Sequence, residues 1–65
     1  MMTKRELMDL GYSLGMLNAK YKTGKTAEEV VQNILALPKM LGKPFLTPEA
    51  TLFIVRYKQG EAEYD

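Results

Sequence analysis

The sequence contains neither cysteine nor histidine. Without cysteine the chain cannot form a disulfide, and without either residue it lacks the side chains that most often hold structural zinc. The same absences remove the commonest nucleophile and the commonest general base of enzymes, and Ser13 has no base partner near it in sequence. We therefore expect no metal, no cofactor and no enzymatic activity, and a protein of a reducing compartment.

Long apolar runs are also missing. No stretch approaches the roughly 18 uninterrupted apolar residues that cross a membrane. Lys4 and Arg5 near the N-terminus are followed by Glu6 and Asp9, which make this segment a poor signal peptide. The sequence therefore predicts a cytoplasmic protein that makes no contact with a membrane.

The net charge is low, and its sign changes along the chain. A formal net charge of +1 gives no electrostatic indication of nucleic-acid binding. Residues 47–65 hold two basic side chains against four acidic ones, so the C-terminal end is acidic. We expect residues 61–65 to form a frayed acidic tail behind a single helical domain of residues 1–60.

A chain of 65 residues is long enough for one domain with a marginal core. Such a chain buries only about 60% of the surface that its unfolded form exposes. Small domains compensate with disulfides, metals, oligomerisation or very good helix packing. Because disulfides are excluded and zinc is disfavoured, oligomerisation and helix packing remain.

Three threonines mark predicted helix starts. Thr3 and Thr26 are each followed by a glutamate three residues later, which is the spacing of a capping box. Thr47 precedes a proline, a residue that the first helical position tolerates. Together with the apolar spacing that follows each threonine, these starts predict helices over residues 4–21, 27–37 and 48–59. The fold class is therefore all-α, a small three-helix domain with a proline-rich connector between the second and third helices.

The apolar spacing also predicts which side chains of each helix face the core. The set comprises a leucine stripe in the first helix and one face of each of the others: Leu7, Leu10, Leu14, Leu17 and Tyr21; Ala27, Val30, Val31, Ile34 and Leu35; Ala50, Phe53, Ile54 and Tyr57. Residues 51–57 also have the composition of a buried strand. The alternative fold is thus two helices and a C-terminal strand, but the helix start at Thr47 favours the helix.

The connector, residues 38–47, contains two of the three prolines and one glycine. Pro38 should end or bend the second helix near residue 37, and Gly42 permits a chain reversal. We expect Met40 and Leu41 to cover the end of that helix. The connector should be ordered, because its apolar side chains would be unfavourable in water.

Gly11 and Gly15 lie four residues apart in the first predicted helix, where each is unfavourable for helix formation. They form a bare backbone patch that favours close packing inside the monomer or, as the weaker interpretation, an interface. Apolar side chains outside the predicted core faces extend this patch on the first and third helices. The candidate interface of a homodimer comprises Met8, Gly11, Tyr12, Gly15, Met16, Leu52 and Val55.

A basic cluster with one aromatic residue lies around the end of the first predicted helix and the turn that follows it. Such clusters can contact phosphate and stack on bases, but they are also typical of solvated helix ends. The cluster and two connector lysines make up the candidate nucleic-acid contacts: Lys20, Tyr21, Lys22, Lys25, Lys39 and Lys43.

Residues 19–26 match a permissive phosphate-loop pattern that ends in Gly-Lys-Thr. The chemistry of that loop needs a preceding strand and glycine-rich backbone around the phosphates. Here the preceding element is a predicted helix, and the chain is too short for a nucleotide-binding fold. We interpret the pattern as a helix end, a glycine turn and the next N-cap.

The functional expectation follows from these observations. Unused apolar surface on a small chain without catalytic residue types favours a non-enzymatic interaction or regulatory protein that binds a protein partner or itself. The alternative is a small nucleic-acid-binding regulator that uses the basic cluster.

Overall fold

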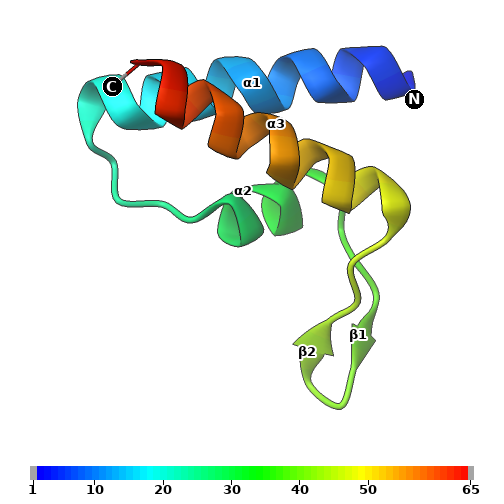
Figure 1. Ribbon diagram of the computed structural model, residues 1–65. Coiled ribbons are helices and arrows are strands. Elements are labelled where there is room, and N and C mark those ends of the chain that lie inside the picture. Colours follow the sequence, from blue (N-terminus) through cyan, green and yellow to red (C-terminus); the bar gives the residue numbers. More distant parts are fainter. Residues whose placement is uncertain (1, 65) are drawn as a thin grey trace.

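A computed structural model describes residues 2–64 and contains three helices and one short hairpin (Figure 1). The helices are α1 (Lys4–Tyr21), α2 (Ala27–Ile34) and α3 (Pro48–Tyr64), and the hairpin pairs β1 (Lys39–Met40) with β2 (Lys43–Pro44). α1 and α3 lie side by side and run in the same direction, α2 packs beneath them, and the hairpin projects from the body (Figure 1). The all-α fold is confirmed, and residues 51–57 are helical rather than a strand.

All three predicted threonine caps are present. The Glu6 N–H donates to the Thr3 hydroxyl at 3.1 Å, and the Thr3 N–H donates to the Glu6 carboxylate at 3.1 Å, which completes the capping box. The Thr3 backbone and hydroxyl thereby lower the pKa of the Glu6 carboxyl. At α2 and α3, the N–H groups of Glu29 and Ala50 donate to Thr26 and Thr47, each at 3.2 Å. Local chemistry therefore sets where each helix begins.

Two helix ends differ from the prediction. α2 ends at Ile34 rather than near residue 37, because the ring of Pro38 would clash with the carbonyl group of Ile34, four residues back. α3 continues through Tyr64, although a frayed tail from residue 61 was expected. The Asn18 amide donates to the Glu61 carboxylate at 2.7 Å, and this contact ties the last turns of α3 to α1.

The core lies where α2 packs against the α1–α3 pair. Its buried apolar residues are Leu7, Ala27, Val31, Ala50, Phe53 and Tyr57. The predicted inner faces of α2 and α3 are confirmed, with Val30, Ile34, Leu35 and Ile54 packed around this cluster. The leucine stripe is right only in part, because Leu17 and Tyr21 are exposed. At its C-terminal end α1 instead buries Asn18.

Glycines form the contact between α1 and α3. A methyl group added at Gly11 would lie 2.8 Å from the Phe53 carbonyl oxygen. One added at Gly15 or Gly60 would overlap a carbonyl oxygen of the facing helix even more closely. Gly11 and Gly15 therefore bring two backbones together inside the monomer, and their faces are closed to any second molecule.

Candidate functional site

The hairpin, defined here as residues 38–46, is the part of the molecule that stands away from the core (Figure 1). Lys39 pairs with Pro44 and Met40 with Lys43, and the Phe45 N–H donates to the Pro38 carbonyl oxygen at 2.7 Å. Leu41 and Gly42 form the two-residue loop at its tip. The connector therefore forms a β-hairpin, which was not predicted from the sequence.

The hairpin exposes its apolar side chains. Leu41 is fully exposed (101%), and Met40, Phe45 and Leu46 expose 63%, 51% and 45% of their surfaces. The expectation that Met40 and Leu41 cover the end of α2 is therefore wrong. The physical reason is the course of the chain after α2, because β1 runs away from the body into the projecting hairpin and carries Met40 and Leu41 away from the end of α2 (Figure 1).

Leu41 also has an unusual backbone conformation. Its φ is +53° and that of Gly42 is +79°, the two positive values that a type I′ hairpin loop requires. Asn, Asp and Gly are preferred at the first position, and a leucine there is disfavoured by about 1–2 kcal/mol. Leu41 therefore adds backbone strain without adding buried contacts, so it does not stabilise the monomer. Residues that are unfavourable for their local backbone conformation are typical of functional positions.

Charge on the hairpin is entirely positive. Between Glu29 and Glu49 the only charged side chains are Lys39 and Lys43. Met40 and Lys43 are cross-strand partners and share one face, whereas the neighbouring Lys39 points to the other. The exposed apolar tip is therefore flanked by a lysine on each face.

The change Leu41→Asn should stabilise the isolated chain. Asparagine tolerates the left-handed conformation, and no buried contact is lost, so the free energy of unfolding should rise by about 1 kcal/mol. Urea unfolding in dilute solution measures this change. Leu41→Ala is the matched control, because it removes the side chain without relieving the backbone. An equal gain from both substitutions would contradict the explanation.

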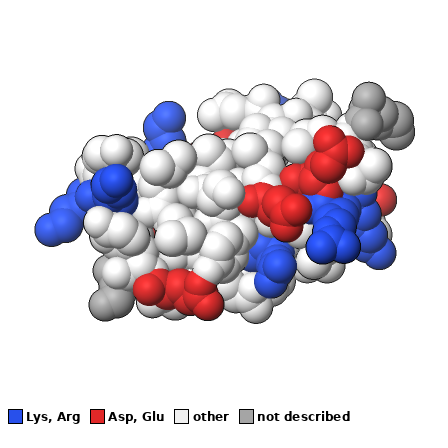
Figure 2. Space-filling view, turned by 90° about the horizontal axis from the view of Figure 1, so that it is seen from above, with Lys and Arg blue, Asp and Glu red and all other residues white. Residues whose placement is uncertain are grey.

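The predicted interface residues occupy a second surface, along α1 and α3. Val55 is exposed, Met8, Tyr12, Met16 and Leu52 are only half-buried, and the two glycines are buried. Seen from above, a broad uncharged area lies left of the centre of the surface, and acidic and basic side chains interrupt the surface right of the centre (Figure 2). The Arg56 guanidinium covers part of it, 5.7 Å from the centre of the Tyr12 ring. This surface offers less exposed apolar area at any one residue than the hairpin tip.

The predicted nucleic-acid contacts fall into two separate groups. Lys20, Tyr21, Lys22 and Lys25 are exposed at the C-terminal end of α1 and in the loop that follows, whereas Lys39 and Lys43 lie on the hairpin at the other side of the molecule (Figure 1). Lys20 lies over the Tyr21 ring at 5.3 Å, so this aromatic face is already occupied. The structure does not bring the six residues into one basic surface.

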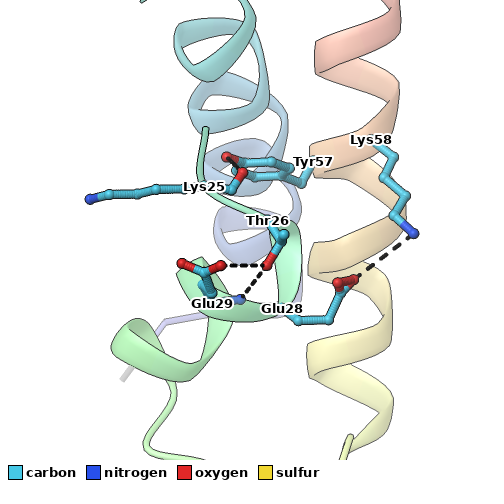
Figure 3. A network of polar contacts seen from close by, with 6 residues as sticks. All are labelled: Lys25, Thr26, Glu28, Glu29, Tyr57 and Lys58. Carbon is cyan, nitrogen blue, oxygen red and sulfur yellow. Dashed lines mark hydrogen bonds and ion pairs between the residues drawn. The ribbon is translucent and has the colours of Figure 1, made fainter. Parts of the chain in front are cut away.

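A polar network holds the loop between α1 and α2. Asn18 is buried and accepts a hydrogen bond from the Thr23 hydroxyl, while the Tyr57 hydroxyl donates to the Lys25 carbonyl oxygen at 3.3 Å. Figure 3 shows Tyr57 reaching Lys25, with the Thr26 cap beside it and the exposed Lys58–Glu28 ion pair (3.9 Å) at its edge. These contacts fix the start of α2 and offer no unpaired group for chemistry.

Tyr57 should make stability fall at high pH. Burial raises the pKa of its hydroxyl, with further contributions from Glu61 and Glu29. The Tyr57 hydroxyl loses its proton near pH 10 in the unfolded chain and at a higher pH in the folded chain. The stabilisation is therefore complete below about pH 10 and is lost as the pH rises through the folded-state pKa.

Urea unfolding of the wild type and of Tyr57→Phe at neutral and alkaline pH isolates this effect. The advantage of the wild type over Tyr57→Phe in free energy of unfolding should shrink above about pH 10, because the other titrating groups are common to both proteins. If the difference between the two proteins does not change with pH, the pKa of Tyr57 is not raised in the folded chain.

Within residues 2–64 no cluster of three or more acidic side chains is placed to hold a metal ion. None of the described helices is long and apolar enough to cross a membrane. Comparison of the chain with protein-family models, with curated proteins and with solved structures finds no match.

Proposed function

We propose that this chain is a non-enzymatic cytoplasmic interaction protein that binds a protein partner, or another copy of itself, through the hairpin. The observation that carries the proposal is the fully exposed Leu41 at the hairpin tip. The backbone conformation of Leu41 is unfavourable, and its exposed side chain adds no hydrophobic stabilisation to the monomer. A partner that buries this side chain would add that stabilisation to the complex.

The hairpin stands apart from the packing that holds the fold together. The core cluster and the residues packed around it come from residues 7–37 and 50–57. Among the described side chains of the hairpin, none is buried. A segment that is ordered by its own backbone pairing and left out of the core is well suited to recognition, because it can change without loss of the fold.

The exposed area sets the expected strength of binding. Full burial of one leucine- or methionine-sized side chain contributes about 1.5–3 kcal/mol. The hairpin carries four such side chains, each partly to fully exposed. Against an association penalty of at least about 4 kcal/mol, this supports a weak to moderate interaction unless the partner also adds surface.

Comparative capture from a native cytosolic extract tests the proposal. The bait is the full chain, with Leu41→Asn as the tip variant and Val55→Asn as the matched control on the α1–α3 surface. A specific partner should be retained by the wild type and by the control, and lost with the tip variant. Partners lost only with Val55→Asn would place the binding surface on α3 and refute the proposal.

A further inference from the structure

Leu41 is strained by the closed turn of the hairpin and not by packing. The positive φ values of Leu41 (+53°) and Gly42 (+79°) belong to the two-residue turn that reverses the chain. A residue with a Cβ atom adopts such a conformation about tenfold less readily than glycine. Backbone strain persists where the surrounding structure holds it. Leu41 is fully exposed, so only the closed turn keeps it in this conformation, and opening the hairpin removes the strain.

Few bonds keep the hairpin closed. β1 and β2 pair over two residues each, and one further hydrogen bond joins the Phe45 N–H to the Pro38 carbonyl oxygen at 2.7 Å. Pro38 and Pro44 have no backbone N–H to donate. A two-stranded hairpin without packing on either face is marginally stable in water, and none of the described hairpin side chains is buried. The hairpin is therefore a weakly supported link between two packed parts of the chain.

The hairpin is also the only covalent connection between α3 and the preceding helices. α3 lies against both α1 and α2. Glu61 accepts a hydrogen bond from Asn18 of α1 at 2.7 Å, and the Tyr57 hydroxyl donates to the Lys25 carbonyl oxygen just before α2 at 3.3 Å. A second copy of the chain has the same place for α3. An α3 that arrives from another copy therefore makes every contact of the core, including the close glycine packing.

We propose that two copies of this chain exchange α3 through opened hairpins and form a two-fold dimer. The inference goes beyond the proposed function and does not depend on it, because it uses the hairpin as a hinge and not as a docking surface. Each copy gives one α3 and receives one, so the assembly is closed at two chains. The exchange needs no additional complementary surface, since the exchanged contacts are those of the monomer.

The direction of the hairpin makes room for the second copy. Its tip points away from the body (Figure 1). When Leu41 and Gly42 straighten, β2 continues in the direction of β1, and α3 comes to lie beyond the tip, where the second body stands. β1 of each copy then pairs with β2 of the other in the register of the closed hairpin. Only the two turn residues change their conformation.

The balance between monomer and dimer depends on the turn. The core and the strand pairing are the same in both forms, so their contributions cancel. Relief of the strain at Leu41 favours the dimer once in each copy, and the lost translational and rotational freedom of one chain opposes it. The dimer is therefore favoured only at high protein concentration. α3 must leave the core before it is exchanged, so the two forms interconvert at the rate of global unfolding.

Refolding at two concentrations gives the first test. The wild-type chain is unfolded in urea and refolded at about 1 mM or at about 1 μM, and light scattering after size exclusion measures its mass. The concentrated sample should contain dimers that persist after dilution until the chain unfolds, and the dilute sample should be monomeric. A single chain after refolding at about 1 mM overturns the inference. A dimer that dissociates on dilution faster than the monomer unfolds overturns it as well.

Cross-linking between variants shows whether α3 has changed chains. Lys58 on α3 and Glu28 on α2 form an exposed ion pair at 3.9 Å (Figure 3), and the chain has no cysteine of its own. Glu28→Cys and Lys58→Cys are made in separate chains and treated with a short thiol cross-linker. Refolding the two chains together should give a cross-linked heterodimer, whereas mixing the two folded monomers should give none. Heterodimers that form equally in both samples indicate ordinary association and refute the exchange.

Substitutions at Leu41 should shift the balance in opposite directions. Asparagine tolerates the closed turn, so Leu41→Asn should raise the dimer dissociation constant about 30-fold, roughly fivefold for each of two turns. Proline cannot adopt a positive φ, so Leu41→Pro should lower that constant. Val55→Asn, an exposed change on α3 outside the hairpin, is the matched control and should have no effect. Equal dissociation constants for Leu41→Asn and Leu41→Pro overturn the role of the turn.

The exchange and the proposed function fail separately. If refolding gives no dimer but Leu41→Asn loses a captured partner, the exchange is refuted and the binding hairpin stands. If the exchange occurs and the capture does not depend on Leu41, the hairpin is a hinge and the proposed function is refuted.

Discussion

Replacing Gly15 with alanine is expected to unfold the protein. The added methyl group would overlap the Tyr57 carbonyl oxygen, so α1 and α3 would have to separate along their whole contact. A domain of this size has a total stability of about 3–10 kcal/mol. Loss of the close packing between α1 and α3 should remove most of this stability, even though alanine is more favourable than glycine within a helix. Circular dichroism should show loss of helix and no cooperative thermal transition.

A graded series distinguishes helix contact from helix propensity. Ser13→Ala lies on the exposed side of α1 and should leave the melting temperature unchanged or slightly higher. Gly11→Ala should be less damaging than Gly15→Ala, because its methyl group would remain 2.8 Å from the Phe53 carbonyl oxygen. If Gly15→Ala melts like the wild type, α1 and α3 are not as close as described.

Replacing Phe53 with alanine is expected to give the second largest loss. The Phe53 ring has no exposed surface and stacks near Tyr57, with 6.2 Å between the ring centroids. Removing such a ring from a packed core lowers the free energy of unfolding by about 3–5 kcal/mol. In a small domain this leaves little cooperative unfolding to measure by urea titration at neutral pH.

Val55→Ala is the control for Phe53→Ala, since it lies two residues away on the same helix and is exposed. Its effect on the free energy of unfolding should stay within about 0.5 kcal/mol. Similar losses from both substitutions would mean that α3 is turned differently against the core.

Helix starts could be predicted from the sequence because their causes are local. Thr3 and Glu6 satisfy each other's backbone groups within one turn, and no distant residue takes part. The inner face of α3 was equally readable from the spacing of Ala50, Phe53 and Tyr57. In both cases the pattern that decides the prediction spans only a few residues of the sequence.

The candidate site depended on longer-range information. From the sequence alone, the apolar residues at the hairpin tip are expected to be buried. The three-dimensional arrangement shows that α2 does not cover Leu41, which stays exposed. The face of α1 was misread for a related reason. Hydrophobicity favoured Leu17 and Tyr21, whereas the close approach of α3 selected the glycines and Asn18, which carry no apolar signal.

The parallel course of α1 and α3 has a consequence for the rate of folding. Their contacts join residues far apart in sequence, as the Asn18–Glu61 hydrogen bond does across 43 positions. Helical domains usually fold quickly because neighbouring helices meet through short turns. Here the chain must first close a long loop, so this protein should fold more slowly than other helical domains of its length. Lengthening the hairpin should slow it only slightly, since each doubling of a loop adds about 0.6 kcal/mol to closure.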